Sequence, residues 1–183
     1  MRGRSVTSLL AKVSMGLAVM AFAAVPALLP SPVLAQTAAL PASKGEVLLT
    51  IDGAISTVTD GSQARLDRAA LQNLGLKELK TSNPFTDGVH LYEGVLLAEV
   101  LDLVGATGTT LTARALDGYS VDIPMQDVRD YPVLLAMKID GQVMSVRQKG
   151  PLWVIYPVDQ YQDLKAESYS ARSIWQLTHV TVK

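Results

Sequence analysis

Short apolar runs that end at Asp-Gly pairs constrain the fold of this chain more than any other feature of its sequence. The segment EVLLTIDG, residues 46–53, is rich in apolar and β-branched residues and ends at such a pair, which is typical of a strand and a turn. The segments TLTARALDGYSVDIP and VLLAMKIDGQVMS each place two runs around Asp-Gly, at 117–118 and 140–141, which predicts two hairpins. The chain is therefore expected to contain more strand than helix.

Helices are expected between these strands. Apolar residues recur at helical spacing over 66–74, and again over YEGVLLAEVLDLVGA, 92–106, where Gly105 is the expected stop. The segment between them, KTSNPFTDGVH at 80–90, has the composition of a loop. Further expected elements are a turn of helix in MQDVRDYP (125–132), a strand in PLWVIYP (151–157) and a last strand in SARSIWQLTHVTVK (170–183). With no internal repeat, the sequence predicts one α+β domain.

The first 35 residues have the composition of a secretory signal peptide. Arg2, Arg4 and Lys12 precede an apolar run from about residue 13 to 29, and Val33-Leu34-Ala35 ends in the small residue that signal peptidase requires. An uncleaved membrane anchor is the alternative, because about 17 apolar residues nearly span a bilayer. Three prolines, at positions 26, 30 and 32, favour cleavage.

We therefore expect an exported protein, either periplasmic or secreted. Its parts would be a signal peptide at 1–35, a flexible lead-in at 36–45 and a folded domain at 46–183, with no stable membrane span after cleavage near Ala35. Cleavage at that point would leave about 148 residues, enough to bury a core without disulfides.

Composition excludes several classes of function. The chain has 16 Lys and Arg against 17 Asp and Glu, and no basic run that could follow a phosphate backbone, so no nucleic-acid partner is expected. It has no cysteine, and hence no thiolate for metal ligation or nucleophilic chemistry. It also has no G-x-S-x-G elbow, no P-loop and no G-x-G-x-x-G.

Isolated polar residues give weaker signals. His90 and His179 are far apart in the sequence, so an ordinary histidine is a better interpretation of each than a metal ligand. The acidic residues Asp159, Asp163 and Glu167 could be acid pairs for catalysis, but solvation of a long loop explains them more simply.

The order of the segments resembles the oxidoreductase molybdopterin-binding domain, which has the sulfite-oxidase fold. The segments that carry the resemblance are GVLLAEVLDLVGA, DGYSVDIP, LLAMKIDGQVM, KGPLWVIYP and ARSIWQLTHVTV, in that order. The similarity extends from about Glu46 to Val182. It is to the small stand-alone exported members, which have no haem or dimerisation domain attached.

The resemblance implies a fold of mixed sheets and short helices. In catalytic members it holds molybdenum through a pterin dithiolene and one protein cysteine, a soft ligand suited to that metal. The corresponding loop here is TSNPFTDG, residues 81–88, which has Ser82 and Asn83 but no cysteine. The family's exported enzymes usually carry a twin-arginine signal, whereas Gly3 separates Arg2 from Arg4 here. Both departures argue against a resident molybdenum centre.

The resemblance also implies a pterin cleft formed by the 81–88 loop, the 117–119 turn, residues 150–156 and the segment before the last strand. Such a cleft, rich in aromatic and cationic side chains, suits an anionic or planar ligand. A core position is the alternative for Trp153 and Tyr156, and a solvated side chain is the alternative for Arg172. The candidate binding residues are Ser82, Asn83, His90, Tyr119, Lys149, Trp153, Tyr156 and Arg172, with Arg147 and Tyr169 close to them in the sequence.

Two functions follow from this reasoning. The first is a non-catalytic periplasmic module, without cofactor, that reuses the pterin cleft to bind a small anionic or planar ligand or a signalling or redox partner protein. The second is a molybdopterin-dependent oxidoreductase, for oxygen-atom or electron transfer, that holds its cofactor without a cysteine ligand. The missing cysteine favours the first, and no residue is assigned a catalytic or metal-binding role.

Overall fold

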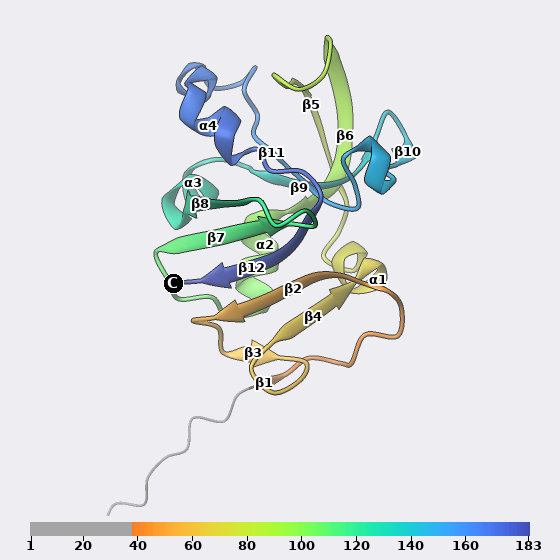
Figure 1. Ribbon diagram of the computed structural model, residues 1–183, viewed down its shortest axis with the longest axis vertical. Coiled ribbons are helices and arrows are strands. Elements are labelled where there is room, and N and C mark those ends of the chain that lie inside the picture. Colours follow the sequence, from red (N-terminus) through yellow and green to blue (C-terminus); the bar gives the residue numbers. More distant parts are fainter. Residues whose placement is uncertain (1–37) are drawn as a thin grey trace, which may run out of the picture. The chain divides into compact units, whose positions relative to one another are not determined.

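The computed structural model describes residues 38–183, in which strands predominate over short helices (Figure 1). The expected signal peptide at 1–35 lies outside the described residues. The described helices are α1 (Arg68–Gln72), α2 (Leu97–Leu103), α3 (Met125–Asp130) and α4 (Glu167–Arg172), with short 3₁₀ helices at Val146–Gln148 and Gln162–Lys165. This content confirms the predicted α+β class.

One five-stranded sheet joins the beginning and the end of the described domain. Its strand order is β4 (Ala64–Asp67), β2 (Val47–Gly53), β12 (Leu177–Val182), β7 (Thr110–Ala115) and β8 (Ser120–Pro124). In its middle, β12 runs parallel to β2, with Val180 opposite Ile51, and antiparallel to β7. The last strand is therefore held on both sides by earlier strands.

The second sheet carries a long hairpin that reaches the candidate site. Its order is β10 (Gln142–Val143), β9 (Leu134–Ile139), β6 (Val89–Leu96) and β5 (Lys77–Ser82), and β11 (Trp153–Ile155) also pairs with β9. Gly94 of β6 lies directly against the backbone of β9 at an irregularity in the pairing, where a side chain would meet the carbonyl of Leu135. Figure 1 shows the β5–β6 hairpin and α4 at the same end of the domain.

Two apolar clusters form the core. The larger one packs α2, through Leu97, Val100 and Leu101, against the inner face of the first sheet, which contributes Ile51 and Leu111 among others. The smaller cluster lies on the second sheet and contains Leu79, Tyr92, Leu134, Ala136, Met144, Trp153 and Ile155. Burial on this scale, at about 25 cal/mol per Å² of apolar surface, supplies the main stabilisation of a chain without disulfides.

Several predicted elements are confirmed. The two Asp-Gly hairpins are β7–β8 and β9–β10, and Asp140 and Gly141 both have positive φ, at 48° and 75°, as a two-residue hairpin turn requires. The helical turn after Pro124 is α3, and the strands predicted in 151–157 and 170–183 are β11 and β12.

Three of the expected local structures are wrong. Residues 64–67 form β4, so the helix expected over 66–74 shortens to α1. Residues 77–82 and 89–96 form β5 and β6, so the loop expected at 80–90 is only a turn. The helix expected from residue 92 begins only at Leu97. For the two helices, the apolar residues at the expected start fit a strand as well as a helix, and pairing with a neighbouring strand decides the outcome. The 80–90 segment is polar, and its two ends are strands because β5 and β6 pair with each other.

The described part of the expected lead-in, residues 38–45, is hydrogen-bonded to later parts of the domain. The short strands β1 (Ala38–Ala39) and β3 (Thr57–Val58) pair in parallel. The backbone N–H groups of Lys44 and Gly45 both donate to Asp67 Oδ2 at 2.9 Å. Hydrogen-bonded structure therefore begins before Glu46.

No helix among residues 38–183 is long and apolar enough to cross a membrane.

Candidate binding site

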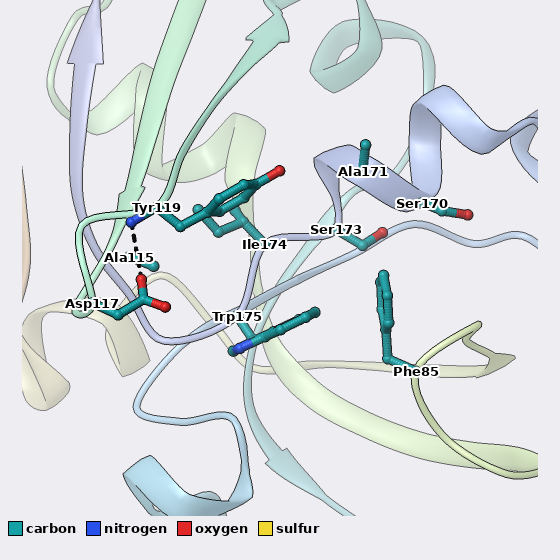
Figure 2. A pocket seen from close by; sticks show the side chains of 9 residues that line it. All are labelled: Phe85, Ala115, Asp117, Tyr119, Ser170, Ala171, Ser173, Ile174 and Trp175. Atoms are coloured by element: carbon teal, nitrogen blue, oxygen red, sulfur yellow. Dashed lines mark hydrogen bonds between the residues drawn. The ribbon is translucent and has the colours of Figure 1, made fainter.

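A cavity of about 290 Å³ lies where three segments that are distant in sequence meet (Figure 2). The turn after β5, the turn between β7 and β8, and the segment from α4 to β12 contribute its walls. Its lining is mainly apolar and includes three aromatic rings. The lining residues are Phe85, Ala115, Asp117, Tyr119, Ser170, Ala171, Ser173, Ile174 and Trp175.

The turn after β5 is built to present Phe85. The side chain of Asn83 is buried, and its Oδ1 accepts a hydrogen bond from the backbone N–H of Phe85 at 2.9 Å. One residue earlier, Ser82 donates to Asp159 twice, from its backbone nitrogen at 2.6 Å and from its hydroxyl at 2.7 Å. These bonds lower the pKa of Asp159. Ser82 and Asn83 therefore shape the loop, while Phe85 faces the cavity.

The β7–β8 turn positions Tyr119 and Asp117 together. Asp117 Oδ1 accepts from the backbone N–H of Tyr119 at 2.9 Å, an Asx-type bond that fixes the turn. Gly118 between them has a φ of 91°, which a side chain would disfavour. Tyr119 is 52% exposed, so its ring forms a wall of the cavity that solvent can reach.

Trp175 forms the wall opposite Tyr119 and makes contacts with other aromatic side chains. Its ring lies edge-to-face with Phe85, with a centroid distance of 4.9 Å, and with Trp153 at 6.4 Å. The ammonium of Lys149 is 5.4 Å from the Trp175 ring centroid and 5.5 Å from that of Trp153. Trp175 in the lining thus packs with Trp153 and Lys149, which lie outside the lining.

Trp153 and Tyr156 occupy core positions, the alternative that the sequence left open. Each is 1% exposed, and neither lines the cavity. The indole N–H of Trp153 donates to the carbonyl of Ser173 at 3.1 Å, so its one polar atom is satisfied inside the core. The β11 segment therefore supports the cavity from behind.

Arg172 is held in a partly buried polar network and is not among the lining residues. Its Nη1 donates to Asp127 Oδ2 at 2.8 Å, and the hydroxyl of Tyr156 donates to the same oxygen at 3.0 Å. The guanidinium also lies 5.1 Å from the centroid of the Tyr169 ring. Burial first, and the negative charge of Asp127 second, raise the pKa of Tyr156 above its ordinary value. This network fixes α4 to α3.

His90 links two turns rather than lining the cavity. Its Nδ1 lies 2.6 Å from Asp140 Oδ2, and its Nε2 lies 2.9 Å from the carbonyl of Asp87. The hydrogen bond with Asp140 raises the pKa of His90, and the same bond lowers the pKa of Asp140. Arg147 is exposed on the 3₁₀ helix at 146–148.

The structure thus brings only part of the predicted site together. Tyr119 is in the lining, and Lys149 contacts the lining residue Trp175; a ligand-binding role for either stays a prediction. The sequence reasoning did not select Phe85, Asp117 or Trp175. Phe85 follows a proline in a polar loop, and Asp117 belongs to the recognised Asp-Gly turn. Because loops and turns often carry binding residues, both positions could have been selected from the sequence.

A comparison with protein-family models matches residues 67–161 to the oxidoreductase molybdopterin binding domain. The match covers more than half of the chain. The chain belongs to this family.

A solved structure with a similar fold is the sulfane dehydrogenase SoxCD from Paracoccus pantotrophus. The TM-score is 0.55 at 16% sequence identity, and the similarity covers 78% of this chain and 39% of that one. The chain thus spans well under half of the SoxCD chain, and the likeness shows a shared fold. No curated protein matches this chain.

The donor groups of this family member do not fit molybdenum held by a protein thiolate. The sequence has no cysteine. Among residues 38–183, no group of three or more His, Asp or Glu side chains is placed to hold a metal ion. At the loop that the resemblance makes equivalent to the ligand loop, Ser82 is already bonded to Asp159 and Asn83 to the backbone of Phe85.

Proposed function

We propose that this chain is an exported, non-catalytic member of the family that uses the cavity between Phe85, Tyr119 and Trp175 to bind a small ligand. The observation that carries the proposal is an aromatic cavity in a chain with no thiol to anchor molybdenum. Ligand sites are typically concave and mostly apolar, with a few polar groups at fixed positions. This cavity matches that description.

The lining favours a ligand with an apolar face over an anion. Of its nine residues, Asp117 is the one with a charged side chain, and none is Lys, Arg or His. Arg172, which the sequence suggested for an anionic group, is paired with Asp127. At about 290 Å³ the cavity is at the lower end of the usual range, so the ligand is small.

Export is supported by the composition of residues 1–35 and is tested separately. Cells that express the full chain are fractionated, and the mass of the protein in each fraction is measured. We expect a periplasmic or secreted form that begins near Gln36. A full-length form found only in the cytoplasm would contradict this part of the proposal.

The absence of molybdenum chemistry is tested on protein from its native compartment. Elemental analysis should find no stoichiometric molybdenum, and the visible spectrum should lack a dithiolene charge-transfer band. A bound molybdenum atom would instead support the oxidoreductase that holds its cofactor without cysteine.

Binding in the cavity is tested with N-phenyl-1-naphthylamine, a neutral aromatic dye that becomes fluorescent in apolar sites. We expect saturable binding that is lost in Phe85→Ala, because this change removes one wall. Val143→Ala is the matched control, since Val143 is 53% exposed and outside the lining. Equal binding by both variants and the parent chain would refute the cavity as the site.

A further inference from the structure

We propose that the ligand of this cavity carries a quaternary ammonium group. The inference rests on the proposed function, namely that the cavity binds a small ligand, and it specifies the chemistry of that ligand. Three observations support it: the arrangement of the rings, the sign of the only charge in the lining, and the mainly apolar character of its walls.

The rings come from three separate segments and surround one space. Figure 2 shows Tyr119 on one side, Trp175 on the opposite side and Phe85 closing the end between them. Phe85 and Trp175 meet at an interplanar angle of 69°, so they form two walls of a corner. Aromatic faces attract cations through the ring quadrupole, and several faces around one point recognise methylated ammonium groups.

The charge in the lining has the matching sign. Asp117 lies at the turn that carries Tyr119, and its Oδ1 is used by the backbone N–H of Tyr119. Its second oxygen is engaged in no hydrogen bond within the described part of the chain. A carboxylate at the rim attracts a cation over several ångströms and needs no direct contact.

The mainly apolar character of the lining favours a quaternary over a primary ammonium. A primary ammonium has three N–H donors, and leaving them unpaired in an apolar cavity is costly. The lining side chains contribute few oxygen atoms, which belong to Asp117, Tyr119, Ser170 and Ser173, and the Ser173 hydroxyl donates to the carbonyl of Tyr169 at 3.1 Å. Apart from the indole nitrogen of Trp175, the other side-chain atoms of the lining are carbon. A quaternary ammonium has no donor to satisfy, and its methyl groups fit aromatic walls.

One neighbouring group opposes a bound cation and thereby makes the sign of the ligand charge testable. The ammonium of Lys149 lies 5.4 Å from the Trp175 ring centroid, outside the lining. It repels a cation in the cavity and attracts an anion. Removing its charge therefore changes the affinity in opposite directions for the two classes of ligand.

The experiment titrates the full chain with choline and with 3,3-dimethylbutan-1-ol, its neutral carbon analogue. Binding is followed by calorimetry and by indole fluorescence, since both tryptophans of the chain lie at or behind the cavity. We expect choline to bind about 10-fold more tightly than the neutral analogue, the ratio that a cation–π contribution of this kind gives.

Two charge variants test the sign. Asp117→Asn keeps an Oδ1 for the Tyr119 N–H and should weaken choline binding severalfold, with no change for the neutral analogue. Lys149→Met should tighten choline binding. Asp122→Asn is the matched control, because Asp122 lies on the same hairpin outside the lining and its Oδ1 can still accept from Thr112.

The possible outcomes separate the two proposals. If choline and its analogue bind equally, or only N-phenyl-1-naphthylamine binds, the ammonium inference is overturned and the cavity remains a ligand site. Weaker choline binding in Lys149→Met, or tighter binding in Asp117→Asn, also overturns the inference. If none of the three probes binds, the proposed function fails together with the inference.

Discussion

Replacing Tyr156 by Phe tests whether this residue belongs to the core network or to a ligand-binding wall. The change removes one hydroxyl, which donates to Asp127 Oδ2 at 3.0 Å, and leaves a ring of almost the same shape. Arg172 still donates to the same oxygen at 2.8 Å, so the carboxylate keeps one partner. A hydrogen bond to a charged group contributes about 1.5–3 kcal/mol. We therefore expect the free energy of unfolding to fall by about 2 kcal/mol.

Urea unfolding followed by indole fluorescence measures this loss. With an m-value of about 2 kcal/mol per M, typical of a domain of this size, the midpoint should fall by about 1 M while m stays constant. Tyr119→Phe is the matched control: its hydroxyl is exposed, and the change should shift stability by less than about 0.5 kcal/mol. A double-mutant cycle with Asp127→Asn should show coupling between positions 127 and 156.

Unchanged stability of Tyr156→Phe, combined with altered affinity for the cavity probes, would refute the core assignment. That result would instead support a position for Tyr156 in the wall of the ligand site, as the family resemblance implied.

Three further predictions concern the β5–β6 hairpin, whose turn carries Phe85. Gly94→Ala should prevent soluble expression or lower the melting temperature by many degrees, because the new methyl group would collide with the backbone of the neighbouring strand; circular dichroism measures this. Ser82→Ala should weaken binding of the neutral dye by loosening the loop held by Asp159, and Ser82→Thr should restore it if the hydroxyl bond is the cause. His90→Gln should destabilise the chain at about pH 5.5 and have little effect at about pH 8.5, since a raised pKa stabilises the fold below the ordinary value and the gain is lost as pH rises through the folded value. Equal effects at both pH values would show that the bond to Asp140 does not depend on the charge of His90.

The hairpins could be predicted from the sequence because their information is local. An Asp-Gly pair at 117–118 or 140–141 needs only its own backbone preferences to form a turn. The segment from 89 to 103 was harder to predict. Its apolar residues satisfy both periodicities, and the change from strand to helix at Leu97 depends on pairing with β9, which is distant in the sequence.

The same difference between local and long-range information explains why only part of the candidate site could be predicted. Tyr119 could be placed because it belongs to a recognised turn. The ring centroids of Phe85 and Trp175 lie 4.9 Å apart although the residues are distant in the sequence, and no local pattern encodes that contact. Arg172 and Tyr156 were expected in the cleft because of the family resemblance. Both donate instead to Asp127, which lies in α3, a segment for which the sequence predicted only a turn of helix.

The parallel pairing of β2 with β12 has a consequence for how the chain acquires its structure. Asp52 and His179, 127 residues apart, meet across this pair at 3.1 Å. The first sheet therefore lacks its middle strand until nearly all of the described chain has been synthesised, and until then the edges of β2 and β7 stay open to other strands. Pairing between distant parts of the chain slows folding. A nascent chain of this protein should thus depend on chaperone binding until β12 (Leu177–Val182) is free to pair, and the residues of this strand should be among the least tolerant of deletion.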